Sequence, residues 1–330
     1  MARYENIQLR FFDYIKRRYS KDSVLLVVMN TLNLKKGAAY KRMNGETTLS
    51  IDELLKIANH FGVSLDAALG NEQFLSFEHP FIDSTSAVDF LDRYTFFLDP
   101  LFNFEGKSSL VYMANEIPVF YYFSYRHIFY FLLSVWDHLH WGEKKLVIKE
   151  TQIDDPRLEK LRNDVANYYE SRPVTEIWNS NMLSSLYQQI LFCVTIRAFE
   201  NKSIIQNLIR EVALLIEHLH ESAGKGQKSH RDNSNVKIFL NEFGNYQNLA
   251  LYHSDKFSSA FIGFDMPHFI VSYNEDFCKY SAQWIEKIKR RSILISSEGY
   301  QFRELFFIKL NKDFEDFKER LRRLVDVYYE

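Results

Sequence analysis

The chain has 330 residues, of which 46% are hydrophobic and 25% charged, a composition typical of a globular protein with two or three domains. Cys193 and Cys278 are its only cysteines, and neither has a second Cys or a His at metal-binding spacing, which argues against a disulfide framework and a zinc site. Residues 1–70 contain 11 Lys and Arg against 7 Asp and Glu, a net charge of +4, so the remainder carries −6. A positive N-terminal segment favours contact with nucleic-acid phosphates.

The sequence predicts neither export nor membrane insertion. Its first residues lack the apolar core of a signal peptide. The most apolar stretch, Ile117 to Trp136, is interrupted by Arg126 and His127, whereas a membrane span needs about 20 mostly apolar residues. We therefore expect a cytoplasmic protein without membrane contact.

The first 70 residues have the apolar spacing of a compact helical bundle. The expected helices cover residues 7–15, 24–31, 35–43 and 51–61, followed by a last turn over 65–69. Asp22 or Ser23 can cap the second helix, and Asn44-Gly45 can end the third.

The fourth helix has the clearest boundaries. Ser50 and Glu53 have the spacing of a capping box, and Gly62 follows the last periodic residue. Residues 71–86 then contain Pro80 and several turn formers without a sustained period, which indicates a domain boundary.

The central part of the chain is interpreted as an all-helical domain. Apolar spacing, with prolines at the joints, predicts helices over residues 87–99, 108–116, 118–140, 157–171, 181–200 and 203–221. Residues 221–235 form the only polar low-complexity segment and are expected to be a mobile loop.

The last third is interpreted as an α+β module with a small antiparallel sheet. Four short segments rich in β-branched and aromatic residues are separated by turn formers, and they cover residues 236–243, 248–253, 257–264 and 269–273. Helices over 275–290 and 300–329 should follow. The predicted fold is mainly α, with domains over residues 1–72, 85–222 and 236–330.

The third predicted helix has two different faces. Ala39, Tyr40 and Met43 can face inward at helical spacing, whereas Lys36, Gly37, Lys41 and Asn44 point elsewhere. Lys can bond the N7 and O6 acceptors of guanine, Asn can read adenine, and both can hold phosphates. A helix of this kind suits the major groove, provided that a supporting helix packs behind it.

Leu34 to Gly45, taken as turn plus recognition helix, and residues 50–69 resemble the Cro and lambda-repressor helix-turn-helix, also called the xenobiotic-response-element class. The resemblance covers about the first fifth of the chain. The third helix lacks the family's Ser/Gln-rich opening and final Glu-Arg-Gly, and the run from Tyr40 to Glu46 is closer to a variant found in regulators with large C-terminal domains.

The resemblance implies a transcription regulator that binds double-stranded DNA. The matching positions expected to contact DNA are Lys35, Lys36, Gly37, Tyr40, Lys41, Arg42, Asn44 and Thr47. Because this class reads paired half-sites and the chain has one copy of the motif, we expect a homodimer assembled through the downstream domains, which could also sense a small-molecule or protein effector.

Two other functions remain open. The bundle could be a protein-interaction or scaffold module whose basic face binds an acidic partner, and salt-dependent binding to duplex DNA separates this hypothesis from the first. An enzyme is the third possibility, but no GxSxG, P-loop or GxGxxG motif occurs, so we predict neither enzymatic activity nor a cofactor.

The aromatic run from Phe120 to Trp136 is interpreted as core, with a ligand pocket or dimer face as the alternative. In that alternative Arg126 and His127 would be the polar anchors. The pairs His138/His140 and His218/His220 are spaced two residues apart, which turns their side chains away from each other on a helix, so we expect no metal site.

Overall fold

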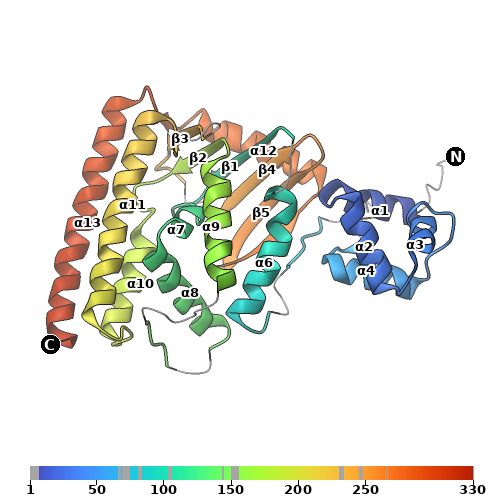
Figure 1. The fold of residues 1–330 in the computed structure, drawn as a ribbon. Helices are drawn as coiled ribbons and strands as arrows, with labels where there is room; N and C mark the ends of the chain where they lie inside the picture. The colour runs from blue at the N-terminus through green and yellow to red at the C-terminus, as the bar shows by residue number, and fades with distance from the viewer. Residues whose placement is uncertain are drawn as a thin grey trace.

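The structure is a computed structural model that describes residues 7–65, 68, 75–80, 84–102, 106–142, 145–149, 156–229, 234–244, 248–265 and 267–329. An N-terminal bundle lies at one end and a larger sheet-and-helix unit makes up the rest (Figure 1). The helices of the bundle are α1 (Ile7–Arg18), α2 (Lys21–Thr31), α3 (Lys36–Met43) and α4 (Ile51–Phe61).

The bundle has its own hydrophobic core. Phe11, Phe12 and Ile15 of α1 are fully buried against Val24 and Val28 of α2. Ala39 and Met43 of α3 and Ile57 of α4 complete this core. Each helix therefore turns one apolar stripe inward, as the sequence spacing predicts.

The boundaries of α4 follow from its caps. Ser50 accepts a hydrogen bond from the Glu53 amide at 3.1 Å, and the Glu53 carboxylate accepts one from the Ser50 amide at 2.9 Å. Gly62 ends the helix with φ 61°, in the left-handed region. Helix α2 begins three residues earlier than predicted, because Ser20 caps it by accepting from the Ser23 amide. The turn expected over 65–69 lies mostly outside the described residues.

A seven-stranded mixed sheet forms the centre of the larger unit. Its strands are β1 (Ser108–Met113), β2 (Val174–Trp178), β3 (Val236–Leu240), β4 (Leu249–Ser254), β5 (Ser258–Asp265), β6 (His268–Ser272) and β7 (Ile293–Leu294). They are ordered β6-β5-β4-β1-β2-β3-β7. Strands β1, β2 and β3 are parallel neighbours, and every other pairing is antiparallel.

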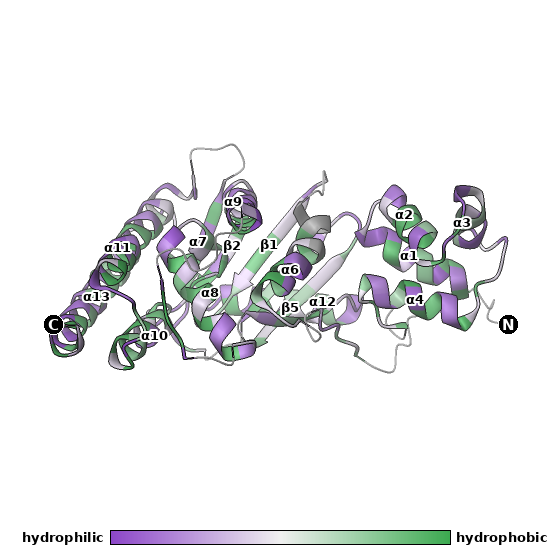
Figure 2. Ribbon diagram, turned by 60° about the horizontal axis from the view of Figure 1, so that its bottom comes forward, coloured by the Kyte–Doolittle hydropathy of each residue, from purple (hydrophilic) through white to green (hydrophobic). Residues whose placement is uncertain are grey.

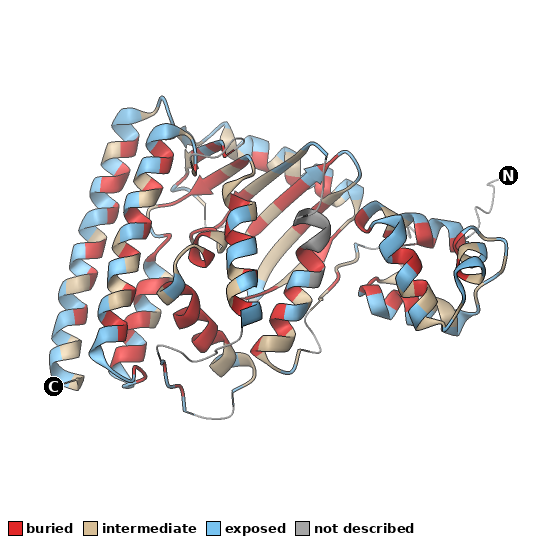
Figure 3. Cartoon of the chain, viewed as in Figure 1, coloured by how far each residue is buried: buried red, intermediate tan, exposed pale blue. Residues whose placement is uncertain are grey.

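Helices cover the two faces of the sheet unequally. They are α6 (Ala87–Phe102), α7 (Phe120–Phe123), α8 (Arg126–His140), α9 (Pro156–Glu170), α10 (Ser184–Thr195), α11 (Lys202–Lys225), α12 (Glu275–Lys289) and α13 (Tyr300–Tyr328). Most pack in one large cluster on one face, whereas Cys278 and Ile285 of α12 pack with Met113 and Ile177 on the other. Hydrophobic and hydrophilic residues alternate along these helices (Figure 2), and buried residues line their inner sides (Figure 3).

The predicted all-helical centre and small antiparallel sheet are wrong. Residues 108–113, expected in a helix, form β1, and β2 lies in a segment for which no strand was expected. Strand β2 is nearly covered on both faces and has Glu176 at its middle, so it shows neither alternation nor an apolar run. Strand β3 pairs in parallel with β2, far from the β4-β5-β6 meander with which it was grouped.

The segment 221–235, expected to be a mobile loop, is also corrected by the structure. Helix α11 continues to Lys225 because Ser222 and Ala223 are buried, and Gly226 ends it with φ 67°. Lys228 is buried, and its ammonium donates hydrogen bonds to the carbonyls of Tyr169 and Arg172. The prediction was wrong because the polar composition of this segment gave no sign of a helix end with a buried cation. Residues 230–233 lie outside the described part of the chain.

The segment between the two units adds to the edge of the sheet. Glu78 and Val271 of β6 exchange both backbone hydrogen bonds, at 2.7 and 2.9 Å. The Glu78 carboxylate is also an ion-pair partner of Arg18, the last residue of α1. This short segment therefore contacts both units. Among the described helices, none is long and apolar enough to cross a membrane.

Candidate nucleic-acid interface

Helix α3 presents a basic, exposed face at the outer end of the bundle. Figures 1 and 2 place it away from the sheet, with α1, α2 and α4 behind it. Lys35, Lys36 and Lys41 are exposed, as are Gly37 and Asn44. Helix α3 itself contains no acidic residue. Five of the eight predicted contact residues therefore lie at the surface.

The opening of α3 has unused hydrogen-bond donors. Lys35 is its N-cap and makes no side-chain cap hydrogen bond, unlike Ser20 and Ser50 in α2 and α4. The backbone amides of a first helical turn have no partner within the helix, and they carry the positive end of the helix dipole. With Lys35 and Lys36 beside them, these amides suit an anionic oxygen such as that of a phosphate.

The other three predicted residues, Tyr40, Arg42 and Thr47, are partly buried and hold the helix in place. The Arg42 guanidinium pairs with Glu53 of α4 at 3.0 Å. The ammonium of Lys21 lies 5.4 Å from the centre of the Tyr40 ring. The pKa of Glu53 is lowered, first by its backbone hydrogen bond at Ser50 and then by Arg42, so this pair stays charged at neutral pH.

Gln8, which the sequence reasoning missed, fixes the loop that follows α3. Its side-chain amide donates to the carbonyls of Arg42 and Thr47 and accepts from the Leu49 amide at 2.8 Å. Gln8 is almost fully buried although it belongs to an amphipathic helix. Its helical spacing from Phe11, Phe12 and Ile15, which puts it on their face of α1, was the available signal. These three bonds connect α1 to the last turn of α3 and to the loop between α3 and α4.

The positive charge of the bundle is less available than its sequence suggests. Arg18 is buried and pairs with Glu78 at 2.9 Å, and Arg17 lies 3.4 Å from Glu275 of α12. Both arginines face the sheet unit, so they do not contribute positive charge to the outer surface at α3. Lys35, Lys36 and Lys41 remain exposed at α3, and Arg10, Lys21 and Lys56 are exposed on the other helices of the bundle.

Arg18 forms the centre of the contact between the two units. Its guanidinium lies over the Tyr14 ring at 4.6 Å and over the Tyr273 ring at 3.9 Å, while the Tyr14 hydroxyl donates to Glu78 at 3.2 Å. Burial is the largest single effect on the pKa of Arg18 and would lower it, but the Glu78 carboxylate together with the nearby tyrosines outweighs burial and raises that pKa. Arg18 therefore stays charged inside the contact and fixes the bundle against the sheet unit.

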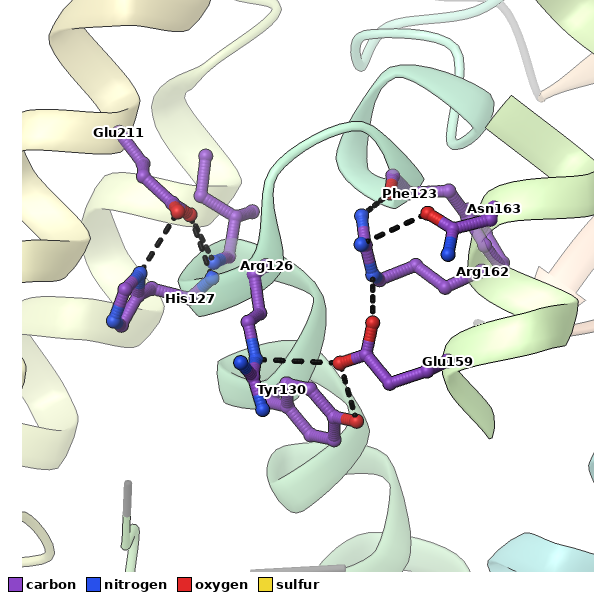
Figure 4. Close-up of polar contacts among 9 residues, drawn as sticks. Phe123, Arg126, His127, Tyr130, Glu159, Arg162, Asn163 and Glu211 are labelled. Atoms are coloured by element: carbon purple, nitrogen blue, oxygen red, sulfur yellow. Dashed lines mark hydrogen bonds and ion pairs between the residues drawn. The ribbon is translucent and has the colours of Figure 1, made fainter. Parts of the chain in front are cut away.

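Most of the aromatic run forms core, although Phe120, Phe123 and Trp136 also line a cavity. Its two predicted anchors bind other side chains (Figure 4). The Arg126 guanidinium pairs with Glu159 at 3.2 Å, and the His127 ring lies 2.8 Å from Glu211. Glu211 also accepts hydrogen bonds from the backbone amides of His127 and Ile128, and these bonds cap the first turn of α8. Arg126 and His127 thus stabilise helix packing.

The second pair of histidines, His218 and His220, have separate partners. His218 contacts the Tyr125 hydroxyl at 3.1 Å and the Lys228 carbonyl at 2.8 Å, whereas His220 pairs with Glu304 at 3.1 Å. In the part of the chain that the structure describes, no three His, Cys, Asp or Glu side chains are arranged to hold a metal ion. Cys193 and Cys278 are buried, and burial raises the pKa of each thiol to about 12.

Glu176 is a buried carboxyl group at the centre of the sheet, and no pattern in the sequence indicated its role. It accepts hydrogen bonds from the hydroxyls of Tyr121 and Tyr169, at 3.0 and 2.7 Å, and from the Trp178 indole at 2.7 Å. Burial raises the pKa of Glu176, and the positive charge of Lys228 opposes that effect. Burial also lowers the pKa of Lys228, to about 8. With every carboxyl oxygen bonded to the core, this cluster supports the fold.

Comparison of the chain with family models, curated proteins and solved structures finds no match.

Proposed function

We propose that the protein is a transcription regulator that binds double-stranded DNA through α3. The observation that carries the proposal is a helix with an exposed basic face and an uncapped first turn, held from behind by Gln8 and the Arg42–Glu53 pair. A rigid helix of this kind can enter the major groove, where Lys41 and Asn44 would meet base edges and Lys35 and Lys36 would meet phosphates. The family resemblance of residues 34–45 and 50–69 adds support.

A regulator of this class acts in the cytoplasm as a homodimer on paired half-sites. We place the dimer contact in the larger unit, because the bundle has one copy of the motif and contacts that unit through Arg18 and Glu78. The bundle would then be carried at a fixed angle by each subunit, and the separation of the two bundles would set the spacing of half-sites. Sedimentation of the intact chain tests the expected dimer.

Binding of a random-sequence duplex pool to the full chain tests the DNA proposal. We expect retention at low salt and enrichment of a paired sequence after repeated selection. Lys36→Ala with Lys41→Ala should weaken binding about tenfold or more, since each cation contributes to phosphate or base contact. Lys287→Ala with Lys312→Ala removes two exposed lysines from α12 and α13 and should leave affinity unchanged.

Absence of duplex binding at low salt would remove this proposal. Equal weakening by both pairs of substitutions would show nonspecific charge attraction and would contradict a role for α3. The same assay tests the alternative of an acidic protein partner. In that case polyglutamate would compete with the duplex for the protein at equal charge concentration.

A further inference from the structure

A cavity of about 90 Å³ lies between the helical layer and the antiparallel side of the sheet. Phe90 and Tyr94 of α6, Phe123 of α7 and Trp136 of α8 form one wall. Tyr112 of β1 and Phe269 of β6 belong to the opposite wall. Space for several water molecules in such surroundings is unusual, because protein interiors are close-packed.

The chemistry of the wall selects uncharged molecules. More than half of the described lining residues are Phe, Tyr or Trp, and none is Asp, Glu, Lys or Arg. An ionised ligand would lose its hydration in this cavity without gaining a counter-charge. That loss would cost on the order of several kcal/mol. Burial raises the pKa of Tyr94 and Tyr112, so their hydroxyls remain neutral.

The shape of the wall favours an aromatic ring. Tyr94 and Phe123 are stacked, with centroids 6.2 Å apart and planes 12° apart, and Phe269 meets Tyr94 edge-on at 6.2 Å. Rings held in these orientations offer both faces and edges to a further ring. Asn248 and His268 are the polar side chains at the wall with nitrogen groups that could orient a polar substituent.

We propose that this cavity binds a compact, uncharged aromatic compound with one polar substituent, of the class of indole or a simple phenol. The cavity is too small for a long acyl chain and has no cation for a carboxylate or phosphate group among its described lining residues. Indole, which has one planar ring system and one N–H donor, is the probe of choice.

The position of the cavity suggests what its occupancy would change. Phe269 on its wall is two residues from Val271, which exchanges backbone hydrogen bonds with Glu78. The Glu78 carboxylate holds Arg18 of α1, and the next residue, His79, contacts the ring of His268 at 5.9 Å. A ligand that displaces β6 would therefore move the contact that orients the bundle. This second step rests on the proposed DNA-binding function.

Calorimetric titration of the full chain with indole tests the binding step. We expect saturable binding with one site per chain, and benzoate, similar in size but anionic, should bind at least about tenfold more weakly. Ala250→Phe places a ring in the cavity and should weaken indole binding about tenfold or more, with Ala250→Leu as a smaller filling change. Ala213→Phe, at a partly buried position of α11 outside the cavity wall, should bind like the parent chain.

A spectroscopic readout locates the site without a change of volume. In protein labelled with 5-fluorotryptophan, indole should shift the resonance of Trp136, assigned with Trp136→Phe, and leave that of Trp284 on α12 unmoved. No saturable binding, binding unaffected by both Ala250 variants, a shift confined to Trp284, or benzoate binding as tight as indole would each overturn the proposal.

The coupling step has its own measurement. Saturating indole should change the affinity of the full chain for its selected duplex at least about threefold, and should not do so in Ala250→Phe. An unchanged affinity despite indole binding would overturn the coupling. If the protein binds no DNA, the proposed function fails while the calorimetric result still decides the ligand site.

Discussion

The N-terminal bundle and the sheet unit are built for different kinds of contact. The bundle buries a small apolar core and turns lysines outward at α3, where a large anionic surface can reach them. The sheet unit buries a far larger set of aromatic side chains and leaves an apolar cavity among them. Charge on a rigid edge suits a macromolecule, whereas a neutral cavity suits a small one.

The two regions meet at a buried ion pair, which makes their relative position depend on few residues. Arg18 and Glu78 have side chains only 3% and 4% exposed, and Tyr14 and Tyr273 enclose the guanidinium. Such a pair tolerates little displacement, because separating the charges inside the protein is costly. This buried pair, with the more exposed Arg17–Glu275 pair, is therefore a contact through which one unit can influence the other.

Breaking that pair should have the largest effect on stability. Glu78→Leu leaves the Arg18 charge buried without its partner, and we expect the free energy of unfolding to fall by about 3–5 kcal/mol. Arg18→Met with Glu78→Leu removes both charges and should recover most of the loss. Urea denaturation of the three proteins measures the effect. A loss in the double variant as large as in the single variant would contradict this account of the contact.

Removing the glutamine behind α3 should have the next largest effect and should be confined to the bundle. Gln8→Leu removes three hydrogen bonds, those to the Arg42 and Thr47 carbonyls and that from the Leu49 amide, which we expect to cost about 2 kcal/mol. Hydrogen exchange should accelerate in the loop after α3 and remain unchanged in β1 and β2. Uniform acceleration throughout the chain would show that the two regions unfold together.

The buried Lys228 should give the sheet unit a pH dependence that the bundle lacks. The pKa of this amine is lowered from 10.5 to about 8 in the folded protein, so the unfolded chain binds more protons between these values. The free energy of unfolding should therefore rise by about 1 kcal/mol between pH 8 and pH 9. Below pH 8 the contribution of Lys228 should not change with pH.

Lys228→Met should remove this rise. Unfolding of both proteins by urea at pH 7, 8 and 9 provides the measurement, and only the difference between their slopes is attributed to Lys228. Identical slopes in the two proteins would show that the amine titrates in the folded state as it does in solvent.

The bundle was predictable from the sequence because its determinants are local. Ser50, Glu53 and Gly62 mark both ends of α4, and the inward spacing of Ala39 and Met43 needs only one helix to be recognised. The same helical spacing predicted that the lysines of α3 would be exposed. The Gln8 contacts were missed because they join residues more than thirty positions apart.

The sheet was missed because its determinants are nonlocal. Val174–Trp178 is a central strand, covered on both faces by elements far away in the chain, and Glu176 interrupts its apolar character. This buried carboxyl group is tolerated because the fold brings Tyr121, Tyr169 and Trp178 to it as hydrogen-bond donors. The cavity likewise draws its walls from segments between Phe90 and Phe269. No single window of sequence contains either feature.

The salt dependence of duplex binding tests the central claim most directly. For the parent chain the logarithm of the association constant should fall steeply with the logarithm of salt concentration, with a slope of about −0.9 for each phosphate neutralised. Lys36→Ala with Lys41→Ala should make that slope shallower by about 1 to 2, while Lys287→Ala with Lys312→Ala should leave it unchanged. A slope that the α3 substitutions do not alter would contradict the assignment of α3 as the DNA-binding helix.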